Sequence, residues 1–588
     1  MRKRILRTAA VLMAALLALL PAASFARVSE PADDEIWDGS IAAEFAGGVG
    51  AEEDPYRITN GAELAYLAQQ VNSGRSFSGE YLLIASDIWL NDMTDFENWS
   101  HENRPENAWT PIGTPDAPFS GNIRAAGWIG GVFIDMPETD NVGLFGFVSA
   151  DSSFDWITLS GAYIRGNDRV GGLFGSCESE NVTMCGADSG CRIIGRDCVG
   201  GVCGYGGSYT DCHCGNCIVS GRNSVGGIIG SYGYAESCIA SCTLFGQASV
   251  GGIIGRKGSA VLCEFAGENN GNNYVGGIVG RGDRGFVIEN CRNFGTLNGN
   301  SLVGGICGSM TDASIDLCSN SGAVTGNLRV AGIVGQTVGP CSITRCWNKG
   351  AVTGVAHVGG IAGELCALSG YTDGNGYRLE NCYNAGSIDA VKPGVGGIAG
   401  DLFYPSEEPS VREETATVSE VMRCCYNVGA VSGPAVYRGG IVGCCELTEW
   451  YEGTELLFTG CYYLDSSCCY SSEYGQAVPY EQLVTQSGLP EFDFEEVWEF
   501  GSLYQFPQLR GLPHNGTMEY GFSVIHGDVN ADGAVDIADA LIALRCSMGL
   551  LYIDPIETVA ADMDRDEEVT AADALLILRL SMGLNIYG

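Results

Sequence analysis

A short glycine-rich phrase, Val-Gly-Gly-aliphatic-x-Gly, recurs through the middle of this chain and constrains its fold more than any other feature. Residues 170–175, Val-Gly-Gly-Leu-Phe-Gly, are a clear copy. The copies begin at Val142, Val170, Val199, Val225, Val250, Val275, Val303, Val330, Val358, Val395 and, in degenerate form, Tyr437. Most steps between copies are 25 to 29 residues long, and the last two are 37 and 42 residues. Such a period predicts a repeat architecture in which each unit stacks on the next.

The residue types of the phrase predict a bent, buried strand. A β-branched residue points inward, two glycines permit φ > 0 or a close backbone approach, and two apolar residues precede a third glycine. One repeat cannot bury its own apolar side, but stacked repeats form a continuous core. We therefore expect a mainly β fold, a parallel β-helix (β-solenoid) of about ten rungs. The Leu-x-x-Leu-x-Leu-x-x-Asn pattern of leucine-rich repeats is absent, and the 86 glycines argue against helical repeats.

A second phrase, Cys-x-Asn-x-Gly, precedes the later copies by about a dozen residues. It occurs at Cys291/Asn293/Gly295, Cys318/Asn320/Gly322, Cys346/Asn348/Gly350, Cys382/Asn384/Gly386 and Cys425/Asn427/Gly429. The chain has 26 cysteines, and their recurrence fits either a buried stack of free thiols or disulfides whose connectivity the sequence does not give. Residues 212–214, Cys-His-Cys, with Cys217 beyond them, fit either a zinc site or a turn of the repeat.

The N-terminal residues 1–26 read as a secretory signal peptide. Four basic residues, Arg2, Lys3, Arg4 and Arg7, precede an apolar run over 9–20 that is too short for a membrane span. Without them, 27 basic residues remain against 71 acidic ones, a net charge of −44. Such a surface repels phosphate backbones, so we expect no nucleic-acid partner. The sequence has no second apolar run of that length, so we expect no membrane insertion after cleavage. The acidic surface suits calcium and neutral substrates, and we expect an extracellular protein.

The flanking segments predict caps for the repeat array. We assign 27–115 to a lead-in and cap, 116–513 to the solenoid with its own C-terminal cap, and 514–525 to a linker. Asn60 followed by Glu63 predicts the start of a short amphipathic helix, which would cover the open end of the solenoid. Insertions near 368–377, 401–420 and 447–455 are expected to project as loops, where function tends to reside.

Two duplicated segments near the C-terminus have the spacing of calcium-binding loops. The first loop offers Asp528, Asn530, Asp532, Asp536, Asp539 and the backbone carbonyl of Ala534. The second offers Asp562, Asp564, Asp566, Thr570, Asp573 and the backbone carbonyl of Glu568. These are hard oxygen donors at EF-hand-like positions, and each loop leads straight into an apolar helix. We therefore expect two calcium sites, the second weaker because Glu567 stands where Gly533 does in the first loop.

The Val-Gly-Gly-aliphatic-x-Gly copies over about 140–445 resemble the GLUG motif, which is found in bacterial IgA-specific metallopeptidases and in large surface proteins. The resemblance implies a right-handed parallel β-helix. It implies no catalytic activity, because GLUG repeats are not a catalytic signature. The peptidases of that family need a His-Glu-x-x-His site, and none of the five histidines lies in one.

The loop-then-helix duplication over 526–588 resembles a type I dockerin, a small all-α calcium-binding domain. The resemblance implies calcium-dependent docking to a cohesin domain of a scaffoldin in a cellulosome-like complex. The family's recognition positions fall on Ile537, Ala538, Leu544 and Arg545 in the first half and on Ala571, Ala572, Leu578 and Arg579 in the second. Better-known dockerins often carry hydroxyl residues at the first two positions, so the apolar residues here imply a different set of cohesins.

Three functions remain open for the solenoid. It could be a glycan- or surface-binding module, a carbohydrate-active enzyme such as a polysaccharide lyase or glycoside hydrolase, or a structural spacer or adhesin. A glycosidase needs two carboxylates at a set separation, and 71 acidic residues leave no pair distinguished. Catalytic residues are therefore not identified, and a binding module is the favoured interpretation.

Overall fold

The computed structural model describes residues 36–366, 378–403, 418–446, 455–468, 474–500 and 506–510, and in the C-terminal region 527, 529, 535, 537–548, 561, 563 and 569–581. The chain divides into two compact units, one of residues 30–482 with 489–491 and one that contains 483–488 and 492–588. The predicted signal peptide and linker lie outside the described residues, and the predicted domain boundaries stay predictions. Within the described part, no helix is long and apolar enough to cross a membrane.

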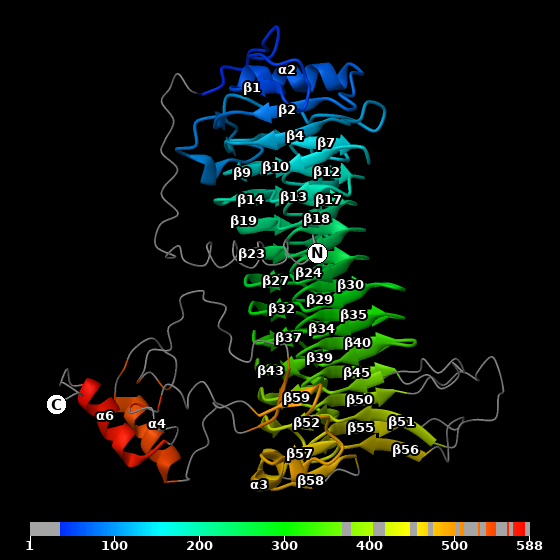
Figure 1. Cartoon of the computed structure of the whole chain (residues 1–588), viewed down its shortest axis with the longest axis vertical. Coiled ribbons are helices and arrows are strands. Elements are labelled where there is room, and N and C mark those ends of the chain that lie inside the picture. The colour runs from blue at the N-terminus through cyan, green and yellow to red at the C-terminus, as the bar shows by residue number, and fades with distance from the viewer. Residues whose placement is uncertain are drawn as a thin grey trace. The chain divides into compact units, whose positions relative to one another are not determined.

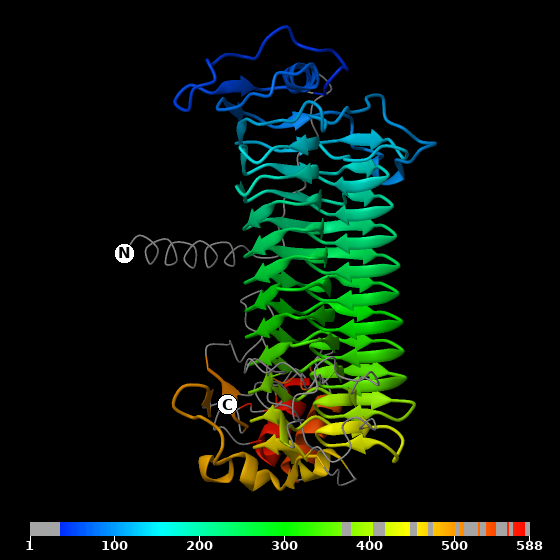
Figure 2. The ribbon, with the colours of Figure 1, turned by 90° about the vertical axis from the view of Figure 1, so that its right-hand side faces the viewer.

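The larger unit is a mainly β solenoid of about 11 turns, as the repeat predicted (Figure 1). A representative rung contains β20 (Asn223–Gly226), β21 (Ile229–Ser231), β22 (Tyr234–Glu236) and β23 (Ile239–Phe245). Each strand pairs in parallel with its counterpart in the next rung, so the rungs stack evenly (Figure 2). The result is four long parallel sheets of ten, eleven, fourteen and 23 strands.

The glycine-rich phrase bends between the ten-stranded and the eleven-stranded sheets. The ten-stranded sheet contains β11 (Asp168–Gly171), β16 (Asp197–Gly200), β20, β24 (Ala248–Gly251), β29 (Asn273–Gly276), β34 (Ser301–Gly304), β39 (Leu328–Ala331), β44 (Ala356–Gly359), β49 (Val395–Gly396) and β54 (Arg438–Gly439). The eleven-stranded sheet contains β7 (Phe145–Val148), β12 (Phe174–Cys177), β17 (Cys203–Tyr205), β21, β25 (Ile254–Arg256), β30 (Val279–Gly282), β35 (Cys307–Thr311), β40 (Val334–Val338), β45 (Ala362–Cys366), β50 (Ala399–Phe403) and β55 (Val442–Glu446).

The other two sheets complete each rung. The fourteen-stranded sheet runs from β1 (Tyr56–Ile58) and β2 (Tyr81–Ile84) through β13 (Val182–Thr183), β18 (Ser208–Thr210), β22, β26 (Ser259–Val261), β31 (Val287–Glu289) and β36 (Ser314–Asp316) to β56 (Glu455–Thr459). The 23-stranded sheet includes β3 (Ile88–Trp89), β14 (Gly186–Asp188), β19 (His213–Ser220), β23, and β58 (Gln476–Val478). β1 and β2, in the predicted lead-in, thus belong to the same sheet as the later rungs.

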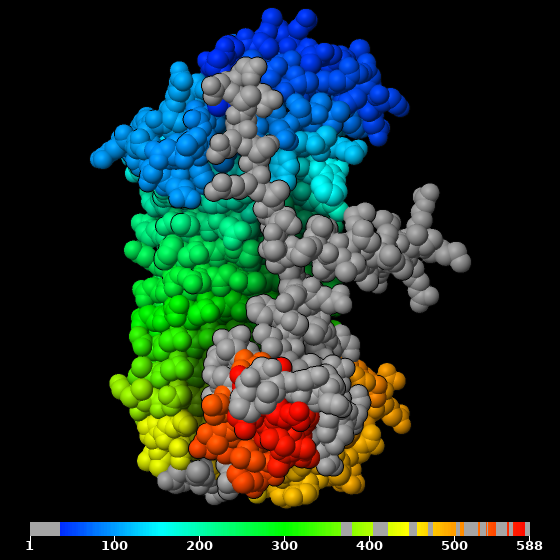
Figure 3. All heavy atoms as spheres, turned by 90° about the vertical axis from the view of Figure 1, so that its left-hand side faces the viewer, coloured from blue at the N-terminus to red at the C-terminus, as the bar shows by residue number. Residues whose placement is uncertain are grey.

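The stacking register places like residues above like. Val170 pairs with Val199, which pairs with Val225, and all three side chains are fully buried. Burial of an aliphatic side chain contributes about 1.5–3 kcal/mol relative to exposure, so one valine per rung supports each added turn. The colours of the solenoid surface follow the order of the chain from its N-terminal end (Figure 3).

The glycines of the phrase allow close backbone approach. A Cβ on Gly172 would lie 2.5 Å from the carbonyl oxygen of Gly201, and one on Gly201 would lie 2.1 Å from that of Gly227. The left-handed conformation occurs instead at the residue before each valine, as at Arg169 (φ 59°) and Ser224 (φ 56°). Of the two roles that the sequence left open for these glycines, the structure has the close approach.

The asparagines of the second phrase form a buried ladder. Asn293, Asn320, Asn348, Asn384 and Asn427 are fully buried, and the side-chain amide of each of the first four donates to the side-chain carbonyl of the next at 2.6–2.8 Å. Each also donates to the carbonyl of its own glycine two residues on, as Asn348 does to Gly350 at 2.9 Å. A buried amide is stable only when its donors and acceptors are satisfied, and the ladder achieves this once per rung.

The cysteines are predominantly buried free thiols. The described cysteines from Cys177 to Cys425, together with Cys461 and Cys468, are free thiols, and all of them except the half-buried Cys198 are buried. Burial raises the pKa of the Cys307 thiol to about 12. The stack of small apolar side chains, one of the two alternatives from the sequence, is therefore the arrangement in the described residues.

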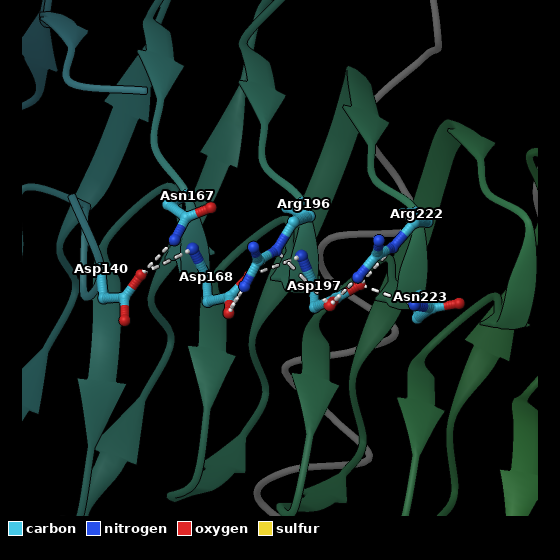
Figure 4. Close-up of polar contacts among 7 residues, drawn as sticks. All are labelled: Asp140, Asn167, Asp168, Arg196, Asp197, Arg222 and Asn223. Atoms are coloured by element: carbon cyan, nitrogen blue, oxygen red, sulfur yellow. Dashed lines mark hydrogen bonds and ion pairs between the residues drawn. The ribbon is translucent and has the colours of Figure 1, made fainter. Parts of the chain in front are cut away.

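A polar ladder runs along the surface beside the ten-stranded sheet (Figure 4). Arg196 contacts Asp168 with both Nε, at 2.8 Å, and Nη2, and Arg222 contacts Asp197 in the same way at 3.2 and 2.6 Å. Asp140 begins the series by accepting from Asn167 at 2.8 Å. These bonds join successive rungs outside the core, where each exposed pair contributes little stability.

The predicted N-terminal helix is α2 (Gly61–Asn72), and it lies at the N-terminal end of the solenoid (Figure 1). The Asn60 side chain accepts from the backbone N–H of Glu63 at 3.0 Å, and the Glu63 carboxylate accepts from the backbone N–H of Thr59 at 2.6 Å. This cap and the burial of Leu64 and Leu67 explain why the helix forms there.

Of the predicted insertions, residues 367–377, 404–417 and 447–454 lie outside the described residues. The predicted bounds of the insertion at 401–420 were too wide, because the residues at both ends belong to strands. Residues 401–403 are part of β50, and residues 418–420 are part of β51 (Val418–Arg423).

Candidate calcium and cohesin-docking site

Two helices of equal length occupy equivalent positions in the duplicated C-terminal segment. α4 (Ile537–Ser547) follows the first predicted calcium loop, and α6 (Ala571–Ser581) follows the second. Each begins within its loop's last residues, as the loop-then-helix pattern predicted. Their small and aliphatic side chains, including Ala543 and Ile577, form a compact buried cluster. The duplication in the sequence is therefore a duplication in the structure.

The last acidic residue of each loop is completely buried and makes the same backbone contact. Asp539 Oδ1 accepts from the Val529 N–H at 2.8 Å, and Asp573 Oδ1 accepts from the Met563 N–H at 2.8 Å. Asp573 also accepts from the backbone N–H and the hydroxyl of Thr570, at 2.8 and 3.0 Å. Both carboxylates thus close their loops by bonding to a residue ten positions earlier.

The described part of the site is compatible with calcium. Asp539, Thr570 and Asp573 supply oxygen atoms of the kind that calcium binds, at positions 12, 9 and 12 of the two loops. The other predicted ligands lie outside the described residues: Asp528, Asn530, Asp532, Ala534, Asp536, Asp562, Asp564, Asp566 and Glu568. The complete ligand sets therefore stay predictions.

The predicted cohesin contacts differ in exposure between the two halves. Ile537 is 68 % exposed, and Leu544 and Arg545 are exposed on α4. Ala571 and Ala572 are exposed at the start of α6, whereas Leu578 and Arg579 are half-buried. Ala538 lies in α4, and its side chain is outside the description.

The structure adds apolar residues that the sequence analysis did not single out. Leu541, 44 % exposed, and Met548, 53 % exposed, lie with Ile537 and Leu544 at spacings of four, three and four residues. Residues at these spacings share one face of a helix. α4 therefore presents an apolar stripe to solvent, which the helical period could have revealed.

The proposed zinc cluster is not assembled. In β19, an irregularity between Gly215 and Ile218 interrupts the alternation, so that both Cys214 and Cys217 are buried in the core. His213 is half-buried and lies beside Gly186. Cys212 is buried and donates to the carbonyl of Thr210 at 3.4 Å. The alternative interpretation, a turn of the repeat, describes these residues.

One cluster in the solenoid brings a histidine and two carboxylates together. Glu364 is 3 % exposed and accepts from Arg329 Nε and Gln336 Nε2, both at 2.7 Å. His357 Nδ1 lies 2.8 Å from Asp401 Oδ2 and 3.9 Å from Glu364 Oε2. The contact with Asp401 raises the pKa of His357. Among the described residues, this is the group whose ligand atoms lie close enough to hold a metal ion.

The comparisons with known proteins identify the C-terminal domain. Residues 526–580 match the model of the dockerin type I domain. The chain is thus a β-solenoid protein that carries a type I dockerin domain. Such domains bind calcium and have cohesins as partners, and the proteins that contain them are generally extracellular.

Two proteins resemble part of the chain in sequence. A protein of Evansella cellulosilytica described as a Gly-rich membrane protein is 31 % identical over 121 residues, which cover 20 % of this chain and 12 % of that protein. Halomucin of Haloquadratum walsbyi is 26 % identical over 173 residues, which cover 27 % of this chain and 2 % of that protein. The chain thus matches only a small part of each relative's length.

One solved structure also aligns with the chain. It is a crystal structure from Bacteroides ovatus described as an immunoglobulin A1 protease, with 15 % identity and a TM-score of 0.22, over 80 % of this chain and 98 % of that one. A TM-score this low bears neither on the fold nor on the function of the present chain.

Proposed function

We propose that this chain is a secreted docking protein whose β-solenoid serves as a glycan- or surface-binding module in a polysaccharide-degrading, cellulosome-like complex. The proposal rests on one observation, the type I dockerin domain at 526–580. Calcium bound by the duplicated loops would hold α4 and α6 in place, and the exposed apolar stripe of α4 would contact the cohesin. The role of the solenoid is to present a rigid, repetitive face.

Exposed aromatic side chains support a binding role for the solenoid. Trp128, Trp156, Tyr232 and Tyr437 are 39 %, 49 %, 47 % and 50 % exposed. The apolar C–H faces of sugar rings pack well on such rings, while Trp and Tyr keep a polar group for hydrogen bonding. The GLUG-like repeats, which occur in large surface proteins, are consistent with the same role.

A second candidate function is a carbohydrate-active enzyme. The observation that favours it is the pairing of His357 with Asp401 beside Glu364, because a buried carboxylate can raise a histidine pKa toward the range of a general acid or base. We nevertheless favour the binding module. Both carboxylate oxygens of Glu364 already accept hydrogen bonds, from Arg329 and Gln336, and are therefore not free to act on a substrate.

Two measurements test the proposal. A purified type I cohesin should retain the calcium-loaded chain and release it when a chelator is added. The same chain, incubated with plant and host polysaccharides, should be retained on one of them without releasing reducing ends or unsaturated products. Release of products would show that the solenoid is an enzyme and not a binding module. If no polysaccharide retained the chain, a role as a spacer or adhesin would remain. If the calcium-loaded chain bound no cohesin, the docking function would be refuted.

A further inference from the structure

One side of the solenoid has a trough whose shape follows from the lengths of its corners. The corners between the eleven-stranded and the fourteen-stranded sheets contain two residues at 206–207, 232–233 and 257–258. The corners at 178–181 and 283–286 contain four residues and stand out on either side. The three short corners therefore form the floor of a hollow of about 890 Å³ between two walls. At about 4.8 Å per rung, the wall rungs lie roughly 19 Å apart.

The floor of the trough offers an exposed aromatic ring. Tyr232 is 47 % exposed, and its ring centroid lies 5.1 Å from that of Tyr205. Lys257 Nζ lies 4.6 Å from the Tyr232 ring centroid and donates to the Tyr232 hydroxyl. Gly207, Gly233 and Gly258 line the floor beside them. Tyr232 therefore lies between Tyr205 and Lys257, and the exposed part of its ring lies next to a fixed cation.

The cations of this region are only loosely neutralised. Asp283 is shared by Arg256 Nη2 at 3.4 Å, Lys257 Nζ at 3.4 Å and Arg281 Nε at 3.6 Å. Charge-assisted hydrogen bonds normally measure about 2.7–2.9 Å, so Asp283 makes no tight bond to any of the three. In the described structure, Arg256 Nε is buried and has no hydrogen-bond partner. Because three cations share one carboxylate, Lys257 and Arg281, which line the hollow, keep donors for a further anion.

The two walls carry opposite charges. Glu178 and Glu180 line one wall. Arg284 and Asp283 line the other together with Arg281 of the preceding strand, so that basic groups outnumber the acidic one there. Arg284 is 81 % exposed and is held by Asp312 at 2.7 Å. A ligand that fits must place an anion at one end and hydrogen-bond donors at the other. A polyanion such as nucleic acid would meet the acidic wall and the chain's net charge of −40.

We propose that this trough binds an acidic oligosaccharide, with a sugar ring packed against the exposed part of the Tyr232 ring and a carboxylate or sulfate group at Lys257, Arg281 and Arg284. Hydroxyl groups of the neighbouring sugars would donate to Glu178 and Glu180. This inference rests on the proposed glycan-binding function and gives that function a place and a ligand class. Sugar acids combine the three features that the trough requires: an apolar ring face, an anion and many hydroxyl donors.

The test uses the full-length mature chain with calcium, titrated with three kinds of short oligosaccharide in a calorimeter. Oligogalacturonides supply carboxylates, chondroitin sulfate fragments supply sulfates, and cello-oligosaccharides supply neither. Binding of either acidic series with weaker binding of the neutral series is the expected result, and the stronger of the two identifies the anion. Raising the salt concentration should weaken the interaction, because the basic wall is exposed.

Variants distinguish the trough from any other surface. We expect Tyr232→Ala, Lys257→Ala and Arg281→Gln each to weaken binding by about tenfold, since each removes one stacking or charge-assisted contact. Tyr232→Phe keeps the ring and should retain most of the affinity. Lys349→Ala is the matched control, because Lys349 also lies over an aromatic ring, 4.8 Å from that of Trp347, but outside the trough. Circular dichroism confirms that each variant is folded.

The failures of the two proposals are separable. If acidic oligosaccharides bound wild type and the trough variants equally well, the trough would not be their binding site. The glycan-binding function of the solenoid would still hold. Neutral oligosaccharides that bind as tightly as the acidic ones, and lose affinity in the Tyr232→Ala variant, would overturn the ligand class. A chain that binds no polysaccharide at all would refute the glycan-binding function together with this inference.

Discussion

The side-chain amide of Asn320 donates to the side-chain carbonyl of Asn348 at 2.7 Å, one rung further along the solenoid. Both side chains are fully buried, and Asn348 donates in turn to Asn384 at 2.7 Å. Each asparagine is therefore both acceptor and donor in a chain of bonds that runs along the stacking direction. The ladder ties the register of one rung to the next, because a shift by one residue would leave buried amides without partners.

Asn348→Ala should destabilise the solenoid by about 2–3 kcal/mol. The substitution removes the acceptor of Asn320 and the donor to Asn384, and it leaves buried polar atoms on both neighbours unsatisfied. Urea unfolding followed by the β-sheet circular-dichroism signal measures the change. Asn298→Ala is the matched control, because Asn298 makes the same bond to Asn270, at 3.1 Å, on the exposed surface. Equal losses for the two variants would contradict a special role for the buried ladder.

The ion pair of His357 and Asp401 should make stability depend on pH. The contact with Asp401 raises the pKa of His357 above its usual 6.5. The stabilisation is therefore complete below about pH 6.5, and it is lost as the pH rises through the folded-state pKa. The pair is partly exposed, so we expect a contribution of at most about 1 kcal/mol.

The difference in unfolding free energy between wild type and His357→Gln, measured from pH 5 to pH 9, checks this. The difference should be largest in acid and should shrink toward alkaline pH. Asp401→Asn removes the partner and should abolish the same pH dependence, while Glu364 keeps its bonds to Arg329 and Gln336. A difference that grows with pH would mean that His357 is stabilised as the neutral form.

The free thiols of the repeat should be unreactive in the folded chain. Burial raises the pKa of Cys177 and that of Cys307 to about 12, so these two thiols carry a negligible thiolate population at pH 8. The other buried thiols of the repeat are shielded from a reagent by the packing around them. A thiol reagent such as DTNB should label few cysteines in the native state and most of them in guanidinium. A reducing agent should leave the melting temperature unchanged. A melting temperature that falls on reduction, with a mass change of two hydrogens per bridge, would show disulfides instead.

The stripe on α4 should be the stronger cohesin contact. Leu541 and Leu575 are both exposed leucines, at 44 % and 56 %, but Leu541 lies between Ile537 and Leu544 on one apolar face. Leu541→Lys should weaken cohesin binding by about tenfold or more, and Leu575→Lys should have a smaller effect. Surface plasmon resonance on an immobilised cohesin measures both. The opposite order would place the contact on α6.

The repeat made much of this structure predictable from the sequence, because each column of like residues reports one position of the rung. The valine column, the free-cysteine stack as one alternative, and α2 with its Asn60 cap could all be anticipated from residue types and spacing. The left-handed position could not, because it falls on residues as different as Arg169, Ser224 and His357.

The trough could not be predicted from the sequence either. It depends on the projection of two four-residue corners past three two-residue corners, and that difference appears only once the rungs are in register. Leu541 and Met548 belong to a different case, because the helical period of α4 could have revealed them before the structure. The recognition positions of the dockerin family include Ile537 and Leu544 but not these two residues.

The two calcium loops should differ in affinity. The loops close in the same way, through Asp539 on Val529 and Asp573 on Met563, but the second loop has Glu567 where the first has Gly533. A side chain in a left-handed turn costs about 1 kcal/mol, so Glu567→Gly should tighten the second site by about fivefold. Gly533→Glu should weaken the first site correspondingly. Calcium titration by calorimetry resolves the two sites, with Asp539→Asn and Asp573→Asn each removing one of them.

The same titration bears on folding. Ligands that bind only the folded state stabilise it, so removal of calcium should melt α4 and α6 while the sheets of the solenoid persist. Chelation should therefore lower the helical circular-dichroism signal and leave the β signal intact. Because α2 lies in the other compact unit, its small helical contribution should remain after chelation. A helical signal unchanged by the chelator would mean that the C-terminal helices fold without calcium, and that the loops serve recognition alone.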